Sequence, residues 1–144
     1  MKLRIVLDTN LFVAAYWNRH SASARIIAAC IDGSLQAYYT ADVERELWLI
    51  MGNIRARNEY RATVSNFIGR AQQVSPWAEV DVRAEDPDDQ KFLVCAASAD
   101  ADYLISSDDH LLKLKHVGRT QIVKPGTFCT LNAQGFEGTK ACSA

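Results

Sequence analysis

The chain has 144 residues, of which 49% are hydrophobic, and a formal net charge of −1. This length suits one domain with its own core, and the composition is that of a globular protein rather than a disordered or fibrous one. No apolar run approaches the ~18 residues of a transmembrane helix, and the N-terminus lacks a signal-peptide pattern, so we expect a cytoplasmic protein with no membrane partner.

The first part of the chain alternates strand-like and helix-like segments. The apolar, β-branched run at 4–7 predicts a buried strand. A helix with one apolar face follows, which either Ser21 or Ser23 can cap and which Gly33 is expected to end. Residues 35–39 then predict a second strand.

The middle of the chain predicts two helices and an edge strand. Thr40 or Asp42 can cap the first helix, whose apolar residues form one stripe. A second, more polar helix is expected over residues 58–72. Around Val80 and Val82, polar and apolar residues alternate as they do in an edge strand.

The last part of the chain begins with a strong helix start. Asp86 is a good N-cap, and Pro87 suits the first helical position, so we expect a helix that runs to about residue 99. The elements expected after it are a strand at 103–106, a short helix around Leu111 and Leu112, a strand at 121–123, and a helical turn from Pro125 to about Phe128.

Strands that alternate with helices predict an α/β fold. We expect a three-layer α/β/α sandwich with a mostly parallel central sheet. It is expected to form a single domain over residues 1–130, followed by a C-terminal tail over residues 131–144 that is small, polar and glycine-bearing. None of the four cysteines has CxxC spacing, which argues against a zinc or redox motif, and Cys30 and Cys95 are expected in the core.

Acidic residues stand where apolar runs end or where helices begin. Asp8 follows the first strand and Asp108 follows a later one, and ligands of open α/β sheets bind at such strand ends. Asp86, Asp88 and Asp89 open a helix. Carboxylates that converge on one rim repel each other unless a cation lies among them. The pattern therefore predicts a divalent metal site.

Each of these acids also has a structural interpretation. Asp8 and Asp108 can each cap the segment that follows them instead of binding a metal. Among the three aspartates that open the helix, Asp86 is the expected N-cap, and helical spacing places Asp89 on the face toward the sheet, which makes it the preferred ligand. Asn10 is placed to hold a neighbouring carboxylate or a water molecule.

Two features remain open at the level of residue patterns. Glu44 and Glu46 flank the apolar stripe of their helix on either side, so periodicity does not choose between them. The net charge hides an asymmetry, since residues 79–109 have ten acidic and two basic residues, or −8, against +7 for the remainder. An acidic site on a basic remainder fits a metal centre that acts on a polyanion, although charges also cluster by chance on solvated faces.

Four stretches, taken in order, form a familiar pattern. They are Val6 to Val13, Glu46-Leu47, Asp86 to Leu93 with its alanine-rich continuation, and Asp102 to Asp108 before Leu111-Leu112. In order and spacing they resemble the PIN-domain ribonucleases, especially the VapC-like toxins of bacterial toxin–antitoxin pairs. The resemblance spans roughly residues 5–128.

The resemblance implies a site of four acids. The implied catalytic residues are Asp8, Glu46, Asp89 and Asp108, of which Asp8, Asp89 and Asp108 are the implied ligands of Mg²⁺ or Mn²⁺. Asn10 matches a polar residue that orders such a site, and Ser107, beside the last acid, is expected to do the same. The chain departs from the family at His110, where an acid is common, and in the tail, which has no counterpart.

The resemblance also implies a reaction and its partners. The implied activity is that of an endoribonuclease in which a metal-activated water cleaves RNA, and the implied partners are RNA, a cognate antitoxin protein and a second copy of the chain in a homodimer. RNA needs cationic contacts, for which there are two candidate groups. They are the RNA-binding candidates Arg55, Arg57 and Arg61, and a second group of Lys113, Lys115 and Arg119. A solvated basic surface is the alternative for either group.

Two other classes of function compete with this one. Phosphatases of the haloacid dehalogenase type also have an aspartate after the first strand, but they need a second acid where this chain has Asn10. A PIN-like module that binds RNA or protein without cutting is the other alternative. Four retained acids argue against such a module, because a domain without catalysis has no reason to keep mutually repelling charges together.

Overall fold

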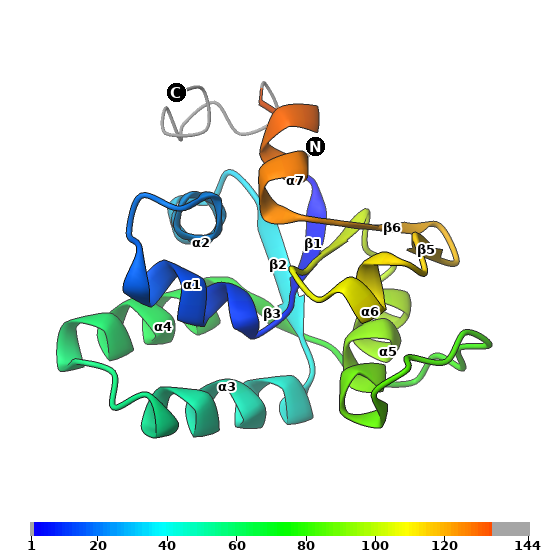
Figure 1. Ribbon diagram of the computed structural model, residues 1–144, viewed down its shortest axis with the longest axis horizontal. Helices are drawn as coiled ribbons and strands as arrows, with labels where there is room; N and C mark the ends of the chain where they lie inside the picture. The colour runs from blue at the N-terminus through cyan, green and yellow to red at the C-terminus, as the bar shows by residue number, and fades with distance from the viewer. Residues whose placement is uncertain (1, 134–144) are drawn as a thin grey trace.

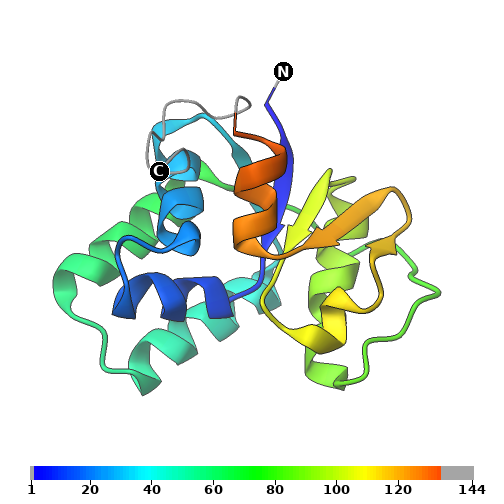
Figure 2. The same cartoon turned by 45° about the horizontal axis from the view of Figure 1, so that its top comes forward.

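The computed structural model describes residues 2–133, which form a six-stranded sheet with helices on both faces (Figures 1 and 2). The strands are β1 (Arg4–Leu7), β2 (Gln36–Tyr39), β3 (Gln72–Gln73), β4 (Tyr103–Ile105), β5 (His116–Val117) and β6 (Thr120–Val123). Their order is β3-β2-β1-β4-β6-β5, and every pair is parallel except β5 with β6. The predicted α/β class with a mostly parallel sheet is confirmed.

The helices begin and end where local chemistry favours it. They are α1 (Asn10–Trp17), α2 (Ala22–Asp32), α3 (Ala41–Asn53), α4 (Asn58–Arg70), α5 (Gln90–Ser98), α6 (Asp109–Leu112) and α7 (Pro125–Leu131), with a 3₁₀ turn, η1 (Pro87–Asp89), before α5. Ser21 caps α2 by accepting from the N–H of Ala24, and Asp86 caps η1 in the same way. Gly33 ends α2 at a φ of 91°, a left-handed conformation that glycine adopts without strain.

The strand β1 divides the core into two clusters. Ile5 and Leu7 pack into one cluster with residues of α1, α2, α3, α4 and α7. Val6 faces the other way and joins Phe92 and Leu93 of α5 in a second cluster. Successive side chains of a strand point to opposite faces, so both faces of the sheet are covered, as a three-layer arrangement requires.

The prediction of an edge strand around Val80 and Val82 is wrong. The described segment between β3 and η1 contains no strand, and the sheet edge is formed instead by β3, directly after α4. Near Val82 a side chain replaces the strand partner, because Gln90 accepts from the N–H of Ala84 and donates to the carbonyl of Val82. The polar–apolar alternation therefore lies in a segment without strand pairing, which the side chain of Gln90 helps to hold in place.

The C-terminal helix is longer than expected. It continues to Leu131 rather than ending near Phe128. Most of the predicted tail, residues 134–144, lies outside the described residues, so the division into a domain and a tail stays a prediction. Within residues 2–133, no helix is long and apolar enough to cross a membrane.

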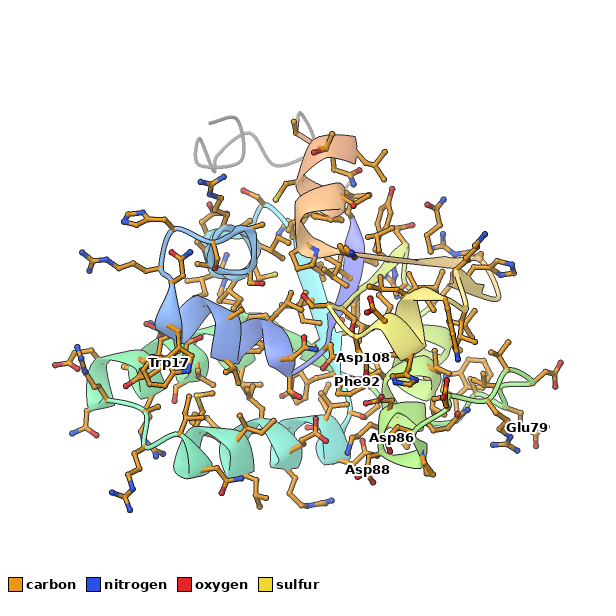
Figure 3. All side chains as sticks on the ribbon, in the orientation of Figure 1. Trp17, Glu79, Asp86, Asp88, Phe92 and Asp108 are labelled. Carbon is orange, nitrogen blue, oxygen red and sulfur yellow. The ribbon has the colours of Figure 1, made fainter. Side chains whose placement is uncertain are left out.

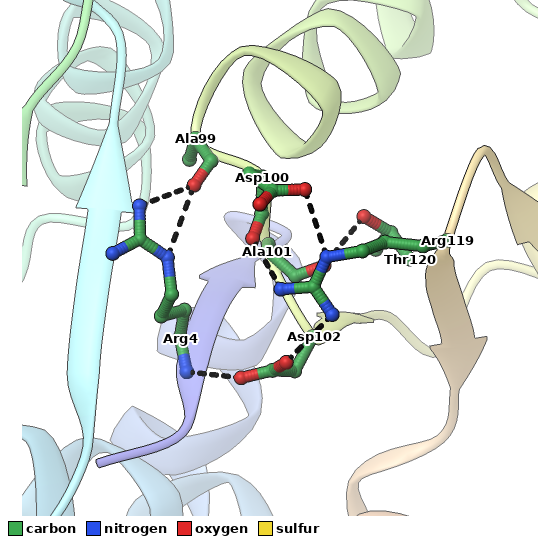
Figure 4. A network of polar contacts seen from close by, with 7 residues as sticks. All are labelled: Arg4, Ala99, Asp100, Ala101, Asp102, Arg119 and Thr120. Atoms are coloured by element: carbon green, nitrogen blue, oxygen red, sulfur yellow. Dashed lines mark hydrogen bonds and ion pairs between the residues drawn. The ribbon is translucent and has the colours of Figure 1, made fainter. Parts of the chain in front are cut away.

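A polar network joins the amino ends of β1, β4 and β6 (Figure 4). The backbone N–H of Arg4 donates to Asp102 at 2.8 Å, and its guanidinium donates to the carbonyl of Ala99. Arg119 binds both Asp100, at 2.8 Å, and Asp102, at 2.9 Å. These contacts hold the central strands together at the edge opposite to their carboxyl ends.

Candidate functional site

Two neighbouring strands end at the candidate site. The order of the sheet reverses between β1 and β4, and open α/β sheets bind ligands at the carboxyl ends of strands beside such a reversal. Asp8 directly follows β1, and its N–H donates to the carbonyl of Ile105 in β4 at 2.9 Å. Asp108 follows β4 at the start of α6. The parallel pairing of the two strands thus brings both acids to one edge of the sheet.

Asp8 is a buried carboxylate, only 4% exposed. Its Oδ2 accepts from the hydroxyl of Ser106 at 2.7 Å, and its Oδ1 accepts from the N–H of Asn10 at 3.1 Å. Burial raises the pKa of Asp8, the two hydrogen bonds lower it, and the charges of Glu46 and Asp108 raise it further. The side chain is therefore fixed in place but electrostatically strained.

A single serine links the two strand ends. Ser106 is fully buried, and its Oγ accepts from the N–H of Asp108 at 2.9 Å while its hydroxyl donates to Asp8. Ser107, which we expected to support the site, is exposed. The spacing Ser-x-Asp is the signal that points to Ser106, because a serine hydroxyl readily accepts from the N–H two residues on.

Asp89 and Asp108 come together from distant segments. Burial raises the pKa of Asp89 to about 7, helped by a hydrogen bond with Asp108 and by the charges of Asp108, Asp8 and Asp86. Asp108 also accepts from the N–H of His110 and so caps α6. The sequence left capping and metal binding as alternatives for Asp108. In the structure Asp108 caps α6 and also lies beside Asp89. Figure 3 shows Asp86 and Asp88 at the start of α5 and Asp108 above them in this view, near the label of Phe92.

Glu46 belongs to the same edge, but both of its oxygens are engaged. Lys91 Nζ lies 2.6 Å from Oε1, and the hydroxyl of Thr9 donates to Oε2 at 2.5 Å. Its neighbour Glu44 instead accepts from the indole N–H of Trp48 at 3.1 Å. Of the two glutamates that periodicity left open, the structure therefore brings Glu46 to the site. Thr9 and Lys91 are contacts that sequence reasoning missed.

The acids do not form a ready-made metal cage. Within residues 2–133, no group of three or more His, Cys, Asp or Glu side chains is arranged to hold one metal ion. Glu46 in particular is already held by Lys91 and Thr9.

The chemistry of the donor set nevertheless fits a hard divalent cation. Asp8, Asp89 and Asp108 offer carboxylate oxygens, which Mg²⁺ and Mn²⁺ prefer. Asn10 follows Asp8 by two residues, and its Oδ1 is a buried oxygen without a hydrogen-bond partner among the described residues. Such an acceptor needs a water molecule or a cation to satisfy it. The site thus has suitable ligands, which must rearrange locally to surround an ion.

The candidate RNA-binding arginines differ in their surroundings. Arg61 donates to the carbonyls of Ala56 and Met51, at 3.0 and 3.2 Å, and so holds the end of α3. Arg55 and Arg57 are exposed near this helix end. RNA binding by the three arginines stays a prediction.

The second basic group is largely engaged in ion pairs. Lys113 pairs with Glu85, which also lies 2.8 Å from Nδ1 of His110. Arg119 is bound in the network at the opposite edge of the sheet (Figure 4). His110, which departs from the acid common at this position, is thus part of a surface cluster with Glu85.

Comparison with known proteins gives one match. A family model described as "PIN domain" matches residues 4–110, more than half of the chain and a span that contains all four predicted catalytic acids. The curated proteins gave no match. The solved structures gave none either.

Proposed function

The chain belongs to the PIN-domain family, and from this premise we propose that it is a metal-dependent endoribonuclease that hydrolyses phosphodiester bonds of RNA. One observation carries the proposal: Asp8, Asp89 and Asp108, from three distant segments, lie close enough that the charges of Asp8 and Asp108 raise the pKa of Asp89 and the charge of Asp108 raises the pKa of Asp8. Carboxylates crowded in this way favour a cation among them. The nuclease-like fold of the family supplies the context for that cation.

The three aspartates are the residues that would hold Mg²⁺ or Mn²⁺. Such an ion would offset charge on the phosphate oxygens and make water a better nucleophile. The protein's own residues hold these acids in position. Ser106 restrains Asp8, and Thr9, which directly follows Asp8 in the chain, restrains Glu46. Glu46, whose charge acts on Asp8, supports the site from beside the ligand set.

We test the proposal with isosteric removal of single carboxylates. Purified Asp8→Asn and Asp89→Asn are each expected to fold and to lose Mn²⁺-dependent RNA cleavage by at least about a hundredfold, the usual range for losing a catalytic group. The matched control is Glu79→Gln, because Glu79 is exposed and lies away from the labelled aspartates (Figure 3). Full activity in either aspartate variant contradicts the assignment. A wild type that binds RNA but neither cleaves it nor binds Mn²⁺ favours the non-catalytic module instead.

We also propose a narrower role, as the toxin of a toxin–antitoxin pair in the cytoplasm. Its support is the VapC-like order of the four motifs between Val6 and Asp108. The partners proposed with it are a cognate antitoxin and a second copy of the chain. Expression of the chain alone is expected to stop bacterial growth, and co-expression of the adjacent gene is expected to restore it. Unchanged growth with an active, expressed nuclease contradicts the toxin role but not the nuclease.

A further inference from the structure

We propose that Lys91 is a positioning residue of the candidate site, which fixes Glu46 beside the three aspartates and keeps it from becoming a fourth metal ligand. The inference rests on the proposed nuclease function and deepens it, since it assigns a role to a residue of the same site.

The geometry around Glu46 is a two-sided clamp. Lys91 Nζ lies 2.6 Å from Oε1, and Thr9 Oγ1 lies 2.5 Å from Oε2. The three residues come from different elements: Lys91 from the first turn of α5, Thr9 from the N-cap of α1, and Glu46 from α3. Each carboxylate oxygen therefore has a partner on a separate part of the fold, and the side chain has little freedom to swing toward Asp8.

The pair is more than a surface ion pair. The side chains of Lys91 and Glu46 are only 21% and 25% exposed. Surface pairs contribute little because water screens them and long side chains lose entropy, but a partly buried, charge-assisted hydrogen bond is screened less. Thr9, on the other side of the clamp, is 3% exposed, so that contact is also shielded from water.

The charge of Lys91 is unusual for its position. It lies two residues after Asp89, and the charges of Asp88 and Asp42 also act on it. Of the ion pairs among residues 2–133, this is the one that joins a cation to a predicted catalytic acid. A positive charge here repels a divalent cation while it orients Glu46, so its loss has opposite effects on metal binding and on catalysis.

The test compares Mn²⁺ affinity with cleavage in the purified full chain. Lys91→Met is expected to bind Mn²⁺ about tenfold more tightly by calorimetry, the effect of removing one solvent-screened unit charge near the ion and freeing a carboxylate. Its kcat for RNA cleavage is expected to fall about tenfold or more, because Glu46 is no longer held. Lys91→Arg, which keeps the charge, is expected to recover most of both properties.

The matched control is Lys2→Met, because Lys2 is exposed before the amino end of β1. Its loss is expected to change neither measurement. Mn²⁺ binding in Lys91→Met that is equal to or weaker than in the wild type overturns the inference, and so does unchanged cleavage. If Lys91→Met does not fold, Lys91→Gln is judged by the same criteria. A wild-type chain that neither binds Mn²⁺ nor cleaves RNA refutes the proposed function itself, which separates the two failures.

Discussion

The side chain of Ser106 links the two strand ends at the candidate site. Its hydroxyl donates to Asp8, and its oxygen accepts from the N–H of Asp108, so one small buried group satisfies an acceptor and a donor from two chain segments. A buried carboxylate that loses a donor keeps its full desolvation cost. The serine therefore matters both to stability and to the placing of Asp8.

This reasoning predicts a measurable difference between two adjacent serines. Ser106→Ala is expected to lower the free energy of unfolding by about 1–3 kcal/mol, because Asp8 Oδ2 and the N–H of Asp108 lose their shared partner. Ser107→Ala, at the exposed neighbouring position, is expected to change it by less than about 0.5 kcal/mol. Urea unfolding of both variants checks the prediction, and equal stabilities would refute it.

Elements with a clear start signal were predictable from the sequence. The strand at 4–7, the helix capped at Ser21 and ended at Gly33, and the helix that follows Asp86-Pro87 all lie where local chemistry puts them. Short-range capping and turn preferences depend on residues within a few positions of each other, and a sequence displays those directly.

Other elements lacked such a signal. Helix α1 was not predicted, because its seven residues after Asn10 are all apolar and show no helical period. Strand β5 has only two residues and exists through its pairing with β6. At Val80 and Val82 an alternating pattern was present, but the partner was the side chain of Gln90 rather than a strand.

The candidate site shows the same division. The strand-end rule and helical spacing pointed to Asp8, Asp89 and Asp108, and the structure brings these three together. The contacts that hold the site were not predictable, because they join residues 37 and 98 positions apart, as in Thr9 with Glu46 and Ser106 with Asp8. Only the three-dimensional packing of α3 against α1 and of β4 against β1 creates them.

For the whole molecule, the acids at the amino ends of the strands are neutralised by an arginine, whereas those at the carboxyl ends lie close to each other. The acid-rich segment 79–109 contributes to both edges. Asp100 and Asp102 lie at the amino edge, where Arg119 neutralises them, whereas Asp89 and Asp108 lie at the carboxyl edge and repel each other. The acid-rich segment thus supplies two aspartates to the structural network with Arg119 and two to the candidate site.

The repulsion at the carboxyl edge predicts a pH-dependent stability. The pKa of Asp89 rises from 3.8 to about 7 on folding, mainly through burial, so the folded metal-free chain retains a proton that the unfolded chain has lost. Stability therefore falls as pH rises from 3.8 to about 7. Asp89→Asn lacks this penalty and is expected to melt at a higher temperature than the wild type at pH 8 in EDTA.

The advantage of Asp89→Asn is expected to vanish below pH 3.8, where the aspartate is protonated in both states. Added Mn²⁺ is expected to reverse the ranking at pH 8, because it stabilises only a chain that binds it. Thermal melting with EDTA and with Mn²⁺ checks both statements. A wild type more stable than the variant in EDTA at pH 8 would show that the carboxylates do not repel each other as described.

The hydrogen bond from the N–H of Asp8 to the carbonyl of Ile105 makes the site depend on the register between β1 and β4. A slip of one residue between β1 and β4 turns every side chain of the slipped strand to the other face of the sheet. Asp8 would then meet neither Ser106 nor Asp108, and a misregistered chain would be chemically silent. With Mn²⁺ bound as proposed, cation binding depends on correct strand alignment, and titration with Mn²⁺ is expected to measure the fraction of correctly folded molecules in a sample.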